Sequence, residues 1–207
     1  MTLLVATTNA NKLREIRQIL ADVAVQLVSL ADVDAPPEPE ETGHTFAENA
    51  RQKALYYAKA TGLSTVAEDS GLEIDAIDGA PGVLSARFPG ETYPEKFAEI
   101  DRRLAARGAR DRRARFVCAL ALVEDARLAF ETQGVVEGRI ASAPRGTAGF
   151  GYDPIFFYPP YGRTLAEVTD AEKAAVSHRG RAFRALHDFL TARGARCSVT
   201  RGPEQAS

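Results

Sequence analysis

The sequence contains few cysteines and no segment of the kind that directs a protein to a membrane or out of the cell. Its two cysteines, Cys118 and Cys197, lie far apart and have no histidine or cysteine at a metal-ligand spacing. This argues against a disulfide-rich scaffold and a structural zinc site, so we expect a reduced, cytoplasmic protein. No basic segment precedes an apolar one near the N-terminus, so no secretion signal is expected.

Long apolar runs and an excess of one charge are also absent. The longest apolar run, Phe116 to Val123, is too short to cross a bilayer. The 26 basic and 28 acidic residues give a formal net charge of −2, so no global field favours a nucleic acid or a membrane as partner. Lysine is scarce among the basic residues, which suggests that it occurs where a compact point charge is needed.

With 207 residues, the chain can bury a full core as one large domain or as one domain with two lobes. A polar loop over residues 7–12 joins the first predicted strand, residues 3–6, to a helical pattern over 13–20. Free N–H groups and the positive end of the helix dipole make such a junction an anion site, with Lys12 beside it. A helix capped by Asn9 with a surface lysine is the alternative.

Two adjacent carboxylates, Glu68 and Asp69, follow an apolar segment over residues 63–67. Residues 70–71 then indicate a turn before an alternating strand over 72–77. Carboxylates at the end of a buried strand have to be protonated or matched by a cation. Oxygen ligands favour Mg²⁺ over zinc, so the sequence predicts a magnesium site here.

A Pro- and Glu-rich segment over residues 31–44 predicts an exposed loop. The helix after it begins at the capping box of residues 45–48 and ends near residue 61. Asn49 and Lys53 share one face of this helix. Lys53 is either a surface lysine or a phosphate contact, and the spacing leaves both readings open.

The middle of the chain predicts a helix and three strands. The helix begins at Thr92 or Pro94 and ends at Gly108. Short connections between the strands favour an antiparallel arrangement. The strands are expected at residues 114–123, 127–133 and 135–141, with a break at Gly134.

The C-terminal part contains two further clusters. Glycines alternate with aromatic residues over 146–157, where the backbone can approach a flat ligand, although plain turn and core roles are the alternative. A capping box at residues 169–172 begins a short helix that carries Lys173. Residues 177–179, Ser-His-Arg, begin the last helix and form a second corner suited to an anion or a carbonyl.

Six segments together resemble one known family. They are Ala6–Lys12, Glu40–Ala50, Asp69–Leu72, Gly79–Phe88, Gly149–Pro154 and Ser177–Arg179, in matching order and spacing between residue 3 and about residue 193. These segments resemble the Ham1/RdgB family, the noncanonical purine nucleoside triphosphate pyrophosphatases (inosine/xanthosine triphosphatases).

The resemblance implies an α/β fold with an elongated mixed central β-sheet, flanked by helices, and two lobes that form a substrate groove. It implies one domain over residues 1–200, a homodimer and Mg²⁺ dependence, with residues 201–207 expected as a disordered tail. The implied reaction hydrolyses ITP, dITP and XTP to the monophosphate and pyrophosphate, which removes deaminated purines from the nucleotide pool. Neither a nucleic acid polymer nor a membrane is an implied partner.

Carried over position by position, the resemblance also implies a set of site residues. Asp69 resembles the general base and a metal ligand, with Glu40 as a further metal ligand, whereas the role of Glu68 stays open. Ser70 resembles a substrate contact. The triphosphate contacts are Thr7, Thr8, Asn9, Ala10, Asn11, Lys12 and Lys53, and the base and sugar contacts are Phe150, Gly151, Tyr152, Asp153, Lys173, His178 and Arg179.

The 6-position of the purine gives a physical reason for selectivity. Hypoxanthine and xanthine present a 6-oxo acceptor, whereas adenine presents a 6-amino donor. Donors on His178, Arg179 or the glycine-rich loop would therefore disfavour ATP by roughly 1–3 kcal/mol for each mismatch.

Two other functions fit part of the pattern. A Maf-type pyrophosphatase acting on modified pyrimidines or on triphosphates broadly would share the carboxylates and lysines. It would not need residues 150–153 or the pair His178-Arg179. A noncatalytic nucleotide-binding protein is disfavoured, because Asp69 and the lysines at 12, 53 and 173 are all present.

Overall fold

The computed structural model describes residues 1–199, the last six of them by backbone alone. The tail expected at 201–207 lies outside the described residues. Seven strands in the described part form one sheet in the order β2-β1-β3-β4-β5-β6-β7. Their bounds are Thr2–Val5 (β1), Gln26–Ser29 (β2), Ser64–Ile74 (β3), Arg113–Glu124 (β4), Arg127–Ile140 (β5), Phe156–Tyr158 (β6) and Arg163–Thr164 (β7).

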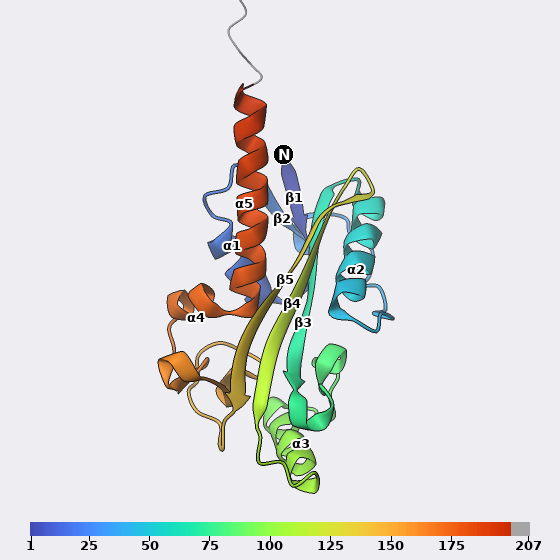
Figure 1. The fold of residues 1–207 in the computed structure, drawn as a ribbon. Coiled ribbons are helices and arrows are strands. Elements are labelled where there is room, and N and C mark those ends of the chain that lie inside the picture. Colours follow the sequence, from blue (N-terminus) through green and yellow to red (C-terminus); the bar gives the residue numbers. More distant parts are fainter. Residues whose placement is uncertain (200–207) are drawn as a thin grey trace, which may run out of the picture.

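The sheet is mixed, which confirms the predicted α/β class. β1 pairs in parallel with β2 and β3, while all pairs from β3 to β7 are antiparallel. β3, β4 and β5 are long and form a twisted ribbon through the molecule (Figure 1). The described part also contains five α-helices, at Ala10–Ile19 (α1), Phe46–Thr61 (α2), Tyr93–Ala106 (α3), Asp170–Val176 (α4) and His178–Val199 (α5).

Helices cover both faces of the sheet. α2 packs on one face, α1 and α5 lie on the other, and α3 lies at the far end of the long ribbon (Figure 1). Each face has its own apolar cluster. On one face α2 packs against residues such as Leu4 and Val117, and on the other α5 packs against residues such as Leu3 and Leu120. A third cluster at the far end gathers α3 and the segment before β6 around Phe116 and Phe156.

Local hydrogen bonds place both ends of α2 where the sequence predicts them, whereas α1 begins at Ala10, within the loop expected over residues 7–12, because Asn9 caps it. The Oγ1 of Thr45 accepts from the Glu48 amide at 3.1 Å, and the Glu48 carboxylate accepts from the Thr45 amide, so the capping box is complete. Gly62 ends α2 in the left-handed region with φ 70°. Such caps satisfy end groups that the helix itself leaves free, and they act within one turn.

Two predicted breaks in the sheet are wrong. β3 continues through Gly71, and β5 continues through Gly134, so five expected strand segments are three long strands. At both glycines another segment of the chain comes too close to leave room for a side chain. A Cβ on Gly71 would meet the Ser85 hydroxyl and lie 2.6 Å from the Gly82 carbonyl oxygen. A Cβ on Gly134 would meet the His178 carbonyl oxygen, where α5 begins.

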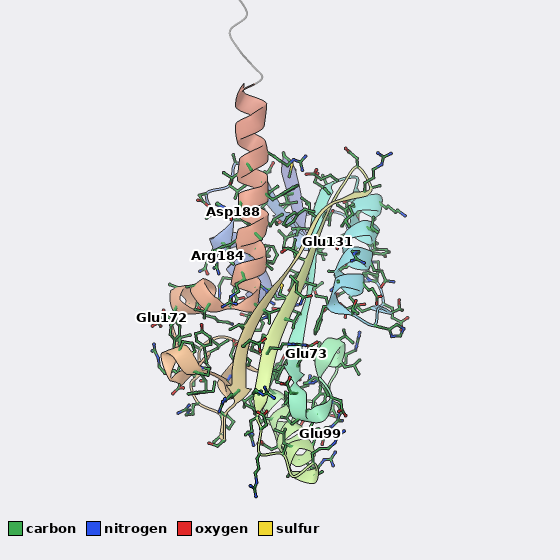
Figure 2. All side chains as sticks on the ribbon, in the orientation of Figure 1. Glu73, Glu99, Glu131, Glu172, Arg184 and Asp188 are labelled. Carbon is green, nitrogen blue, oxygen red and sulfur yellow. The ribbon has the colours of Figure 1, made fainter. Side chains whose placement is uncertain are left out.

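Charged side chains lie on the helices and on the long strands (Figure 2). Glu73 on β3 pairs with its cross-strand neighbour Arg115 on β4 at 2.6 Å, and Glu131 on β5 pairs with Arg51 on α2 at 2.6 Å. Such exposed pairs contribute at most about 1 kcal/mol each. None of the helices described over residues 1–199 combines the length and apolarity needed to cross a membrane. The two-lobed domain over 1–200 stays a prediction.

Candidate functional site

A cavity of about 460 Å³ lies over the middle of β3. Its walls come from the loop before α1, the loop before α2, the middle of α2, residues 83–87 and 150–153, and the helices α4 and α5. The structure therefore brings segments from across the chain to one place. The predicted site residues that line the cavity are Thr7, Thr8, Asn9, Lys12, Lys53, Asp69, Ser70, Phe150, Gly151, Tyr152, Asp153, Lys173, His178 and Arg179.

Three predicted residues do not line the cavity. Ala10 and Asn11 form the start of α1 with exposed side chains, and Glu40 is also exposed. The neighbouring Glu41 lines the cavity instead, with its Oε1 2.5 Å from the Nζ of Lys53. The structure thus places the carboxylate of Glu41, and not that of Glu40, beside the site.

Asp69 faces the cavity on the α2 side of the sheet. Its Oδ2 accepts from the Nδ2 of Asn49 at 2.9 Å, and its Oδ1 accepts from the Ser70 amide at 2.9 Å. The Oδ1 of Asn49 in turn accepts from the Gly43 amide at 2.8 Å. Asn49 therefore ties the loop that carries Glu41 to the position of Asp69.

Burial raises the pKa of Asp69 to about 6. The hydrogen bond from Asn49 opposes this rise, while the carboxylates of Glu41 and Glu68 add to it. A carboxyl whose pKa is shifted toward neutrality and which faces a cavity is a candidate for proton transfer. The carboxyl is also a candidate to share a cation with Glu41, because a cation would offset both negative charges.

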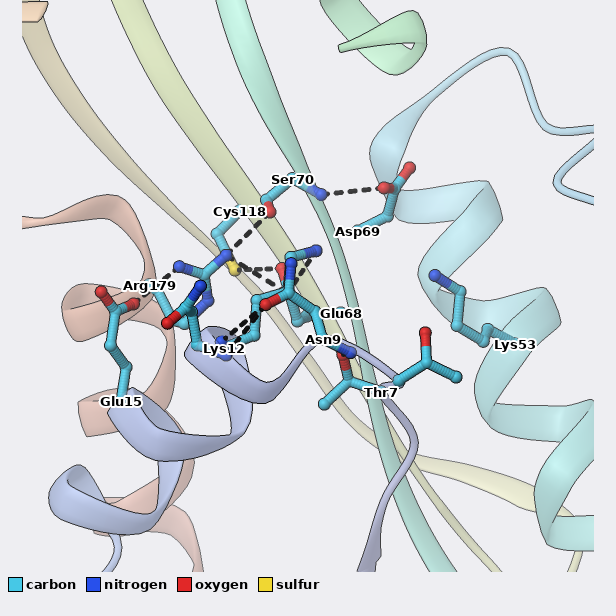
Figure 3. Close-up of polar contacts among 12 residues, drawn as sticks. Thr7, Asn9, Lys12, Glu15, Lys53, Glu68, Asp69, Ser70, Cys118 and Arg179 are labelled. Atoms are coloured by element: carbon cyan, nitrogen blue, oxygen red, sulfur yellow. Dashed lines mark hydrogen bonds and ion pairs between the residues drawn. The ribbon is translucent and has the colours of Figure 1, made fainter. Parts of the chain in front are cut away.

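Glu68 does not join Asp69 on that side. Successive residues of a strand point to opposite faces, and Glu68 points toward α1 and α5 (Figure 3). Its Oε1 lies 2.7 Å from the Nζ of Lys12 and 3.3 Å from the Nη2 of Arg179. Burial opposes ionisation, but Arg179 and Lys12 hold the pKa of Glu68 well below its usual range. Glu68 and Asp69 therefore do not share one cation. The charge of Glu68 is balanced by Lys12 and Arg179.

The loop before α1 is capped as the alternative interpretation predicts, yet it also lines the cavity. The Oδ1 of Asn9 accepts from the amides of Asn11 and Lys12 at 3.0 and 3.2 Å. The Asn9 amide donates to the Oγ1 of Thr7 at 3.2 Å, and the Thr8 hydroxyl donates to the Oε2 of Glu38 at 3.2 Å. The loop is thus ordered by its own side chains, and Lys12 follows it in the first turn of α1, where it lines the cavity.

Lys53 is a buried residue of α2 and not a surface lysine. Its side chain is 8% exposed, and its ammonium binds Glu41 within the cavity wall. Burial disfavours the charge, but the bond to Glu41 and the nearby Asp69 raise the pKa of Lys53 above its usual value. It therefore carries its positive charge beside Asp69.

The opposite side of the cavity holds cations around an aromatic ring. The Nζ of Lys173 lies 4.5 Å from the ring centroid of Phe150, and the Arg179 guanidinium lies 5.5 Å from it. Asp153 fixes this arrangement, because its Oδ2 accepts from the Phe150 amide at 2.8 Å and from Lys173 at 2.6 Å. Phe150 is half-buried and keeps a surface on which a flat ligand can stack.

Tyr152 supports the wall from behind. Its ring packs edge-on against Tyr93 at 5.3 Å, and its hydroxyl donates to the Ser85 carbonyl at 2.8 Å. The Ser85 hydroxyl donates to the carbonyl of Gly82 and accepts from the amide of Leu72. Ser85, which the sequence did not single out, therefore links the segment around Gly82 to the part of β3 that borders the cavity.

His178 is neutral and unsatisfied at one nitrogen. Its ring stacks on Phe116 with centroids 4.7 Å apart. Burial and the charge of Arg179 hold the pKa of His178 well below its usual value. Its Nδ1 is buried without a hydrogen-bond partner among the described residues, and other atoms of His178 border the cavity.

The carboxylates fit a magnesium ion that is held only partly by the protein. No group of three or more His, Cys, Asp or Glu side chains within residues 1–193, where side chains are described, is arranged to hold a metal by itself. Mg²⁺ is commonly bound by one or two carboxylates together with water and substrate phosphates. Asp69 and Glu41 supply two carboxylates in one cavity, beside the cations that phosphates require.

Comparison with known proteins relates this chain to a family. Residues 3–189 match the sequence model of the Ham1 family. The dITP/XTP pyrophosphatase of Exiguobacterium sibiricum is 46% identical over 193 residues, which cover 92% of this chain and 98% of that protein. The dITP/XTP pyrophosphatase of Thermus thermophilus is 48% identical over 187 residues, 90% of each chain.

Solved structures of proteins from this family have the same fold. A HAM1 protein from Coxiella burnetii aligns with a TM-score of 0.87 at 43% identity, covering 93% of this chain and 99% of that one. The nucleoside-triphosphatase / dITP/XTP pyrophosphatase from Mycobacterium abscessus aligns with a TM-score of 0.73 at 46% identity, covering 90% and 98%. Because sequence and fold match over nearly the whole length of these proteins, the chain belongs to the Ham1 family.

Proposed function

We propose that this protein hydrolyses noncanonical purine nucleoside triphosphates (ITP, dITP and XTP) to the monophosphate and pyrophosphate. Relatives that match over most of the chain are named dITP/XTP pyrophosphatases, which supports a hydrolase acting on triphosphate anhydrides. One observation carries the proposal. A single cavity places a carboxyl of raised pKa between lysines on one side and an aromatic ring with donors on the other.

The phosphate side is formed by Lys12, Lys53 and the loop before α1. A triphosphate is strongly anionic, and phosphoryl transfer depends mainly on positioning and on stabilisation of its charge. Both lysines are already paired with carboxylates, at 2.7 Å to Glu68 and 2.5 Å to Glu41. They are thus held in place before the substrate arrives, and part of their side chains borders the cavity.

Asp69 and Glu41 would hold the magnesium ion. In this proposal Glu41, and not Glu40, is the second carboxylate ligand. Glu41 borders the cavity, and the bond between Gly43 and Asn49 keeps its loop beside Asp69. When bound, Mg²⁺ supplies neutralisation of phosphate charge and lowers the pKa of a bound water.

Asp69 is the proposed general base. The amides of Asn49 and Ser70 orient its two oxygens, and a pKa near 6 keeps it mostly ionised at neutral pH while leaving it able to accept a proton. Asp69 would accept a proton from the attacking water. Ser70 lies next to it and lines the same cavity, as expected of a substrate contact.

The base side would read the 6-position of the purine. Phe150 offers a stacking surface, and His178 and Arg179 line the cavity beside it from the same helix turn. A donor that faces a 6-oxo group gains a hydrogen bond, whereas one that faces a 6-amino group loses its acceptor. Discrimination by one such contact is worth about 10- to 100-fold.

The test is a product assay with the purified protein on ITP, dITP, XTP, ATP, dUTP and dTTP, with and without Mg²⁺. Added inorganic pyrophosphatase distinguishes pyrophosphate from phosphate as the product. We expect Mg²⁺-dependent release of pyrophosphate from the deaminated purines, and loss of about 100-fold or more of kcat in Asp69→Asn with an unchanged fold. Preference for dUTP or dTTP would favour a Maf-type pyrophosphatase, and an inert protein that binds ITP would favour a noncatalytic role.

Removal of deaminated purines from the nucleotide pool, a cytoplasmic location and assembly as a homodimer belong to the same proposal. The resemblance to the family supports them, and the relatives named above act on small-molecule triphosphates. Size-exclusion chromatography with light scattering would test the dimer, since a mass of one chain in solution would contradict it.

A further inference from the structure

Glu15 is a nearly buried carboxylate for which sequence motifs gave no role. It lies on α1, three residues after Lys12, and its side chain is 12% exposed. Its carboxylate points toward α5 and away from the loop that ends at Asn9 (Figure 3). Its Oε1 lies 2.9 Å from the Nζ of Lys173, and its Oε2 lies 2.7 Å from the Nη1 of Arg179.

These two cations are the ones that cover the Phe150 ring. Lys173 is also bonded to Asp153 at 2.6 Å, and Arg179 is also bonded to the Ser70 hydroxyl at 3.0 Å. Lys173 therefore has one contact of its own, with Asp153, and Arg179 has two, with Ser70 and Glu68. Glu15 adds a shared contact that sets how far Lys173 and Arg179 lie from each other and from the ring.

Glu15 joins the two cations on the Phe150 side of the cavity, and Glu68 connects Arg179 to Lys12. Burial opposes its ionisation, but Arg179 and Lys173 hold its pKa below the usual value, so it is charged. Without this charge, the two cations would face each other in a buried place with one counter-ion fewer. The resulting chain of alternating charges runs through Lys12, Glu68, Arg179, Glu15, Lys173 and Asp153.

We propose that Glu15 is a positioning residue for purine selectivity, which holds Lys173 and Arg179 against Phe150 so that they face a 6-oxo purine. This inference rests on the proposed function. Glu15 acts through these cations and does not itself reach the ring or the phosphates. Its loss should therefore affect recognition of the base far more than recognition of a triphosphate without a base.

The experiment compares Glu15→Gln with wild type in three measurements: kcat/KM for ITP, kcat/KM for ATP, and inhibition by inorganic tripolyphosphate. A bond between charged groups is lost, so we expect kcat/KM for ITP to fall about 10- to 100-fold. We expect a smaller fall for ATP, so that the ITP to ATP ratio narrows. The inhibition constant of tripolyphosphate should stay within about twofold, because it does not reach the Phe150 side.

Two further variants separate positioning from general stability. Glu15→Asp keeps the charge at a shorter reach and should restore part of the ITP to ATP ratio. Glu124→Gln is the matched control, because Glu124 has a side chain 15% exposed, pairs with Arg193 at 2.7 Å and lies outside the cavity lining. It should keep the wild-type ratio.

The outcomes distinguish the inference from the proposed function. An active wild type whose Glu15→Gln variant keeps the ITP to ATP ratio, or loses ITP and tripolyphosphate recognition equally, overturns the role of Glu15 alone. Failure of Glu15→Asp to differ from Glu15→Gln also counts against positioning by this carboxylate. A wild type that leaves ITP and dITP intact overturns the proposed function, and the inference with it.

Discussion

Replacement of Gly134 by alanine should destabilise this protein, although alanine is normally the better residue in a strand. Gly134 lies within β5 beneath the first turn of α5. A Cβ there would meet the carbonyl oxygen of His178 and lie 2.7 Å from the amide nitrogen of Ala182. Both neighbours are backbone atoms of a helix, so relief requires movement of the helix and not of one side chain.

The sign of the change in stability shows whether there is space for a Cβ at Gly134 or whether the helix backbone excludes it. If space were available, alanine would stabilise the protein by about 0.4–1 kcal/mol, because it restricts the unfolded chain. Added atoms in a packed interior cost about 1–3 kcal/mol, and we expect a net loss of about 1–2 kcal/mol. For a protein of this size, such a loss lowers Tm by about 2–8 °C.

Thermal unfolding by circular dichroism, under conditions where it is reversible, measures this change directly. Gln133→Ala is the control, since Gln133 is exposed on the same strand and should alter stability by less than about 0.5 kcal/mol. We also expect a lower kcat/KM for ITP in Gly134→Ala, because His178 and Arg179 begin the displaced helix. A Tm at or above the wild-type value would refute the close approach as the reason for this glycine.

The remaining predictions concern the cavity. Glu41→Gln should raise the Mg²⁺ concentration needed for half-maximal activity by about 10-fold or more, whereas Glu40→Gln should leave it unchanged; the reverse pattern would restore Glu40 as the ligand. Lys53→Ala should weaken ITP binding about 10- to 100-fold with little effect on inosine monophosphate, and an equal loss for both would remove its phosphate role. Arg179→Ala should narrow the ITP to ATP ratio of kcat/KM about 10-fold, and an unchanged ratio would place base recognition elsewhere.

Signals that act within one helical turn were predictable from the sequence. The predicted capping boxes at Thr45 and Thr169 begin α2 and α4, because each closes its hydrogen bonds over three residues. The start predicted at Thr92 or Pro94 also has such a box, at Thr92. The predicted corner at residues 177–179 begins α5, and Lys173 lies close to it in sequence on the preceding short helix α4.

Glycine and loop positions were harder to predict. Glycine occurs both at turns and where another segment comes close, and only the three-dimensional neighbours of Gly71 and Gly134 decide between these uses. In the irregular loop before α2, no repeating period fixes which of Glu40 and Glu41 faces inward. In the folded protein the Gly43 amide donates to the Oδ1 of Asn49, and Glu41 lines the cavity.

The pair Glu68-Asp69 shows a signal that was present but not used. Alternation along a strand sends neighbouring side chains to opposite faces, so two adjacent carboxylates on an unbroken β3 cannot serve one ligand in the same way. The expected turn at residues 70–71 obscured this. Glu15 offered no comparable local signal, because its partners Lys173 and Arg179 lie more than a hundred residues away in sequence.

The uninterrupted course of β4 has a mechanical consequence. Phe116 belongs to the apolar cluster at the far end, while Val117 and Cys118 belong to the clusters on the two faces of the sheet. No loop within this strand separates these clusters, so it provides no joint about which one end of the protein could swing. If the cavity widens or narrows, the change must be distributed as a small change in twist over the many paired residues of β3, β4 and β5. The free energy needed for it rises with the number of hydrogen bonds that are distorted.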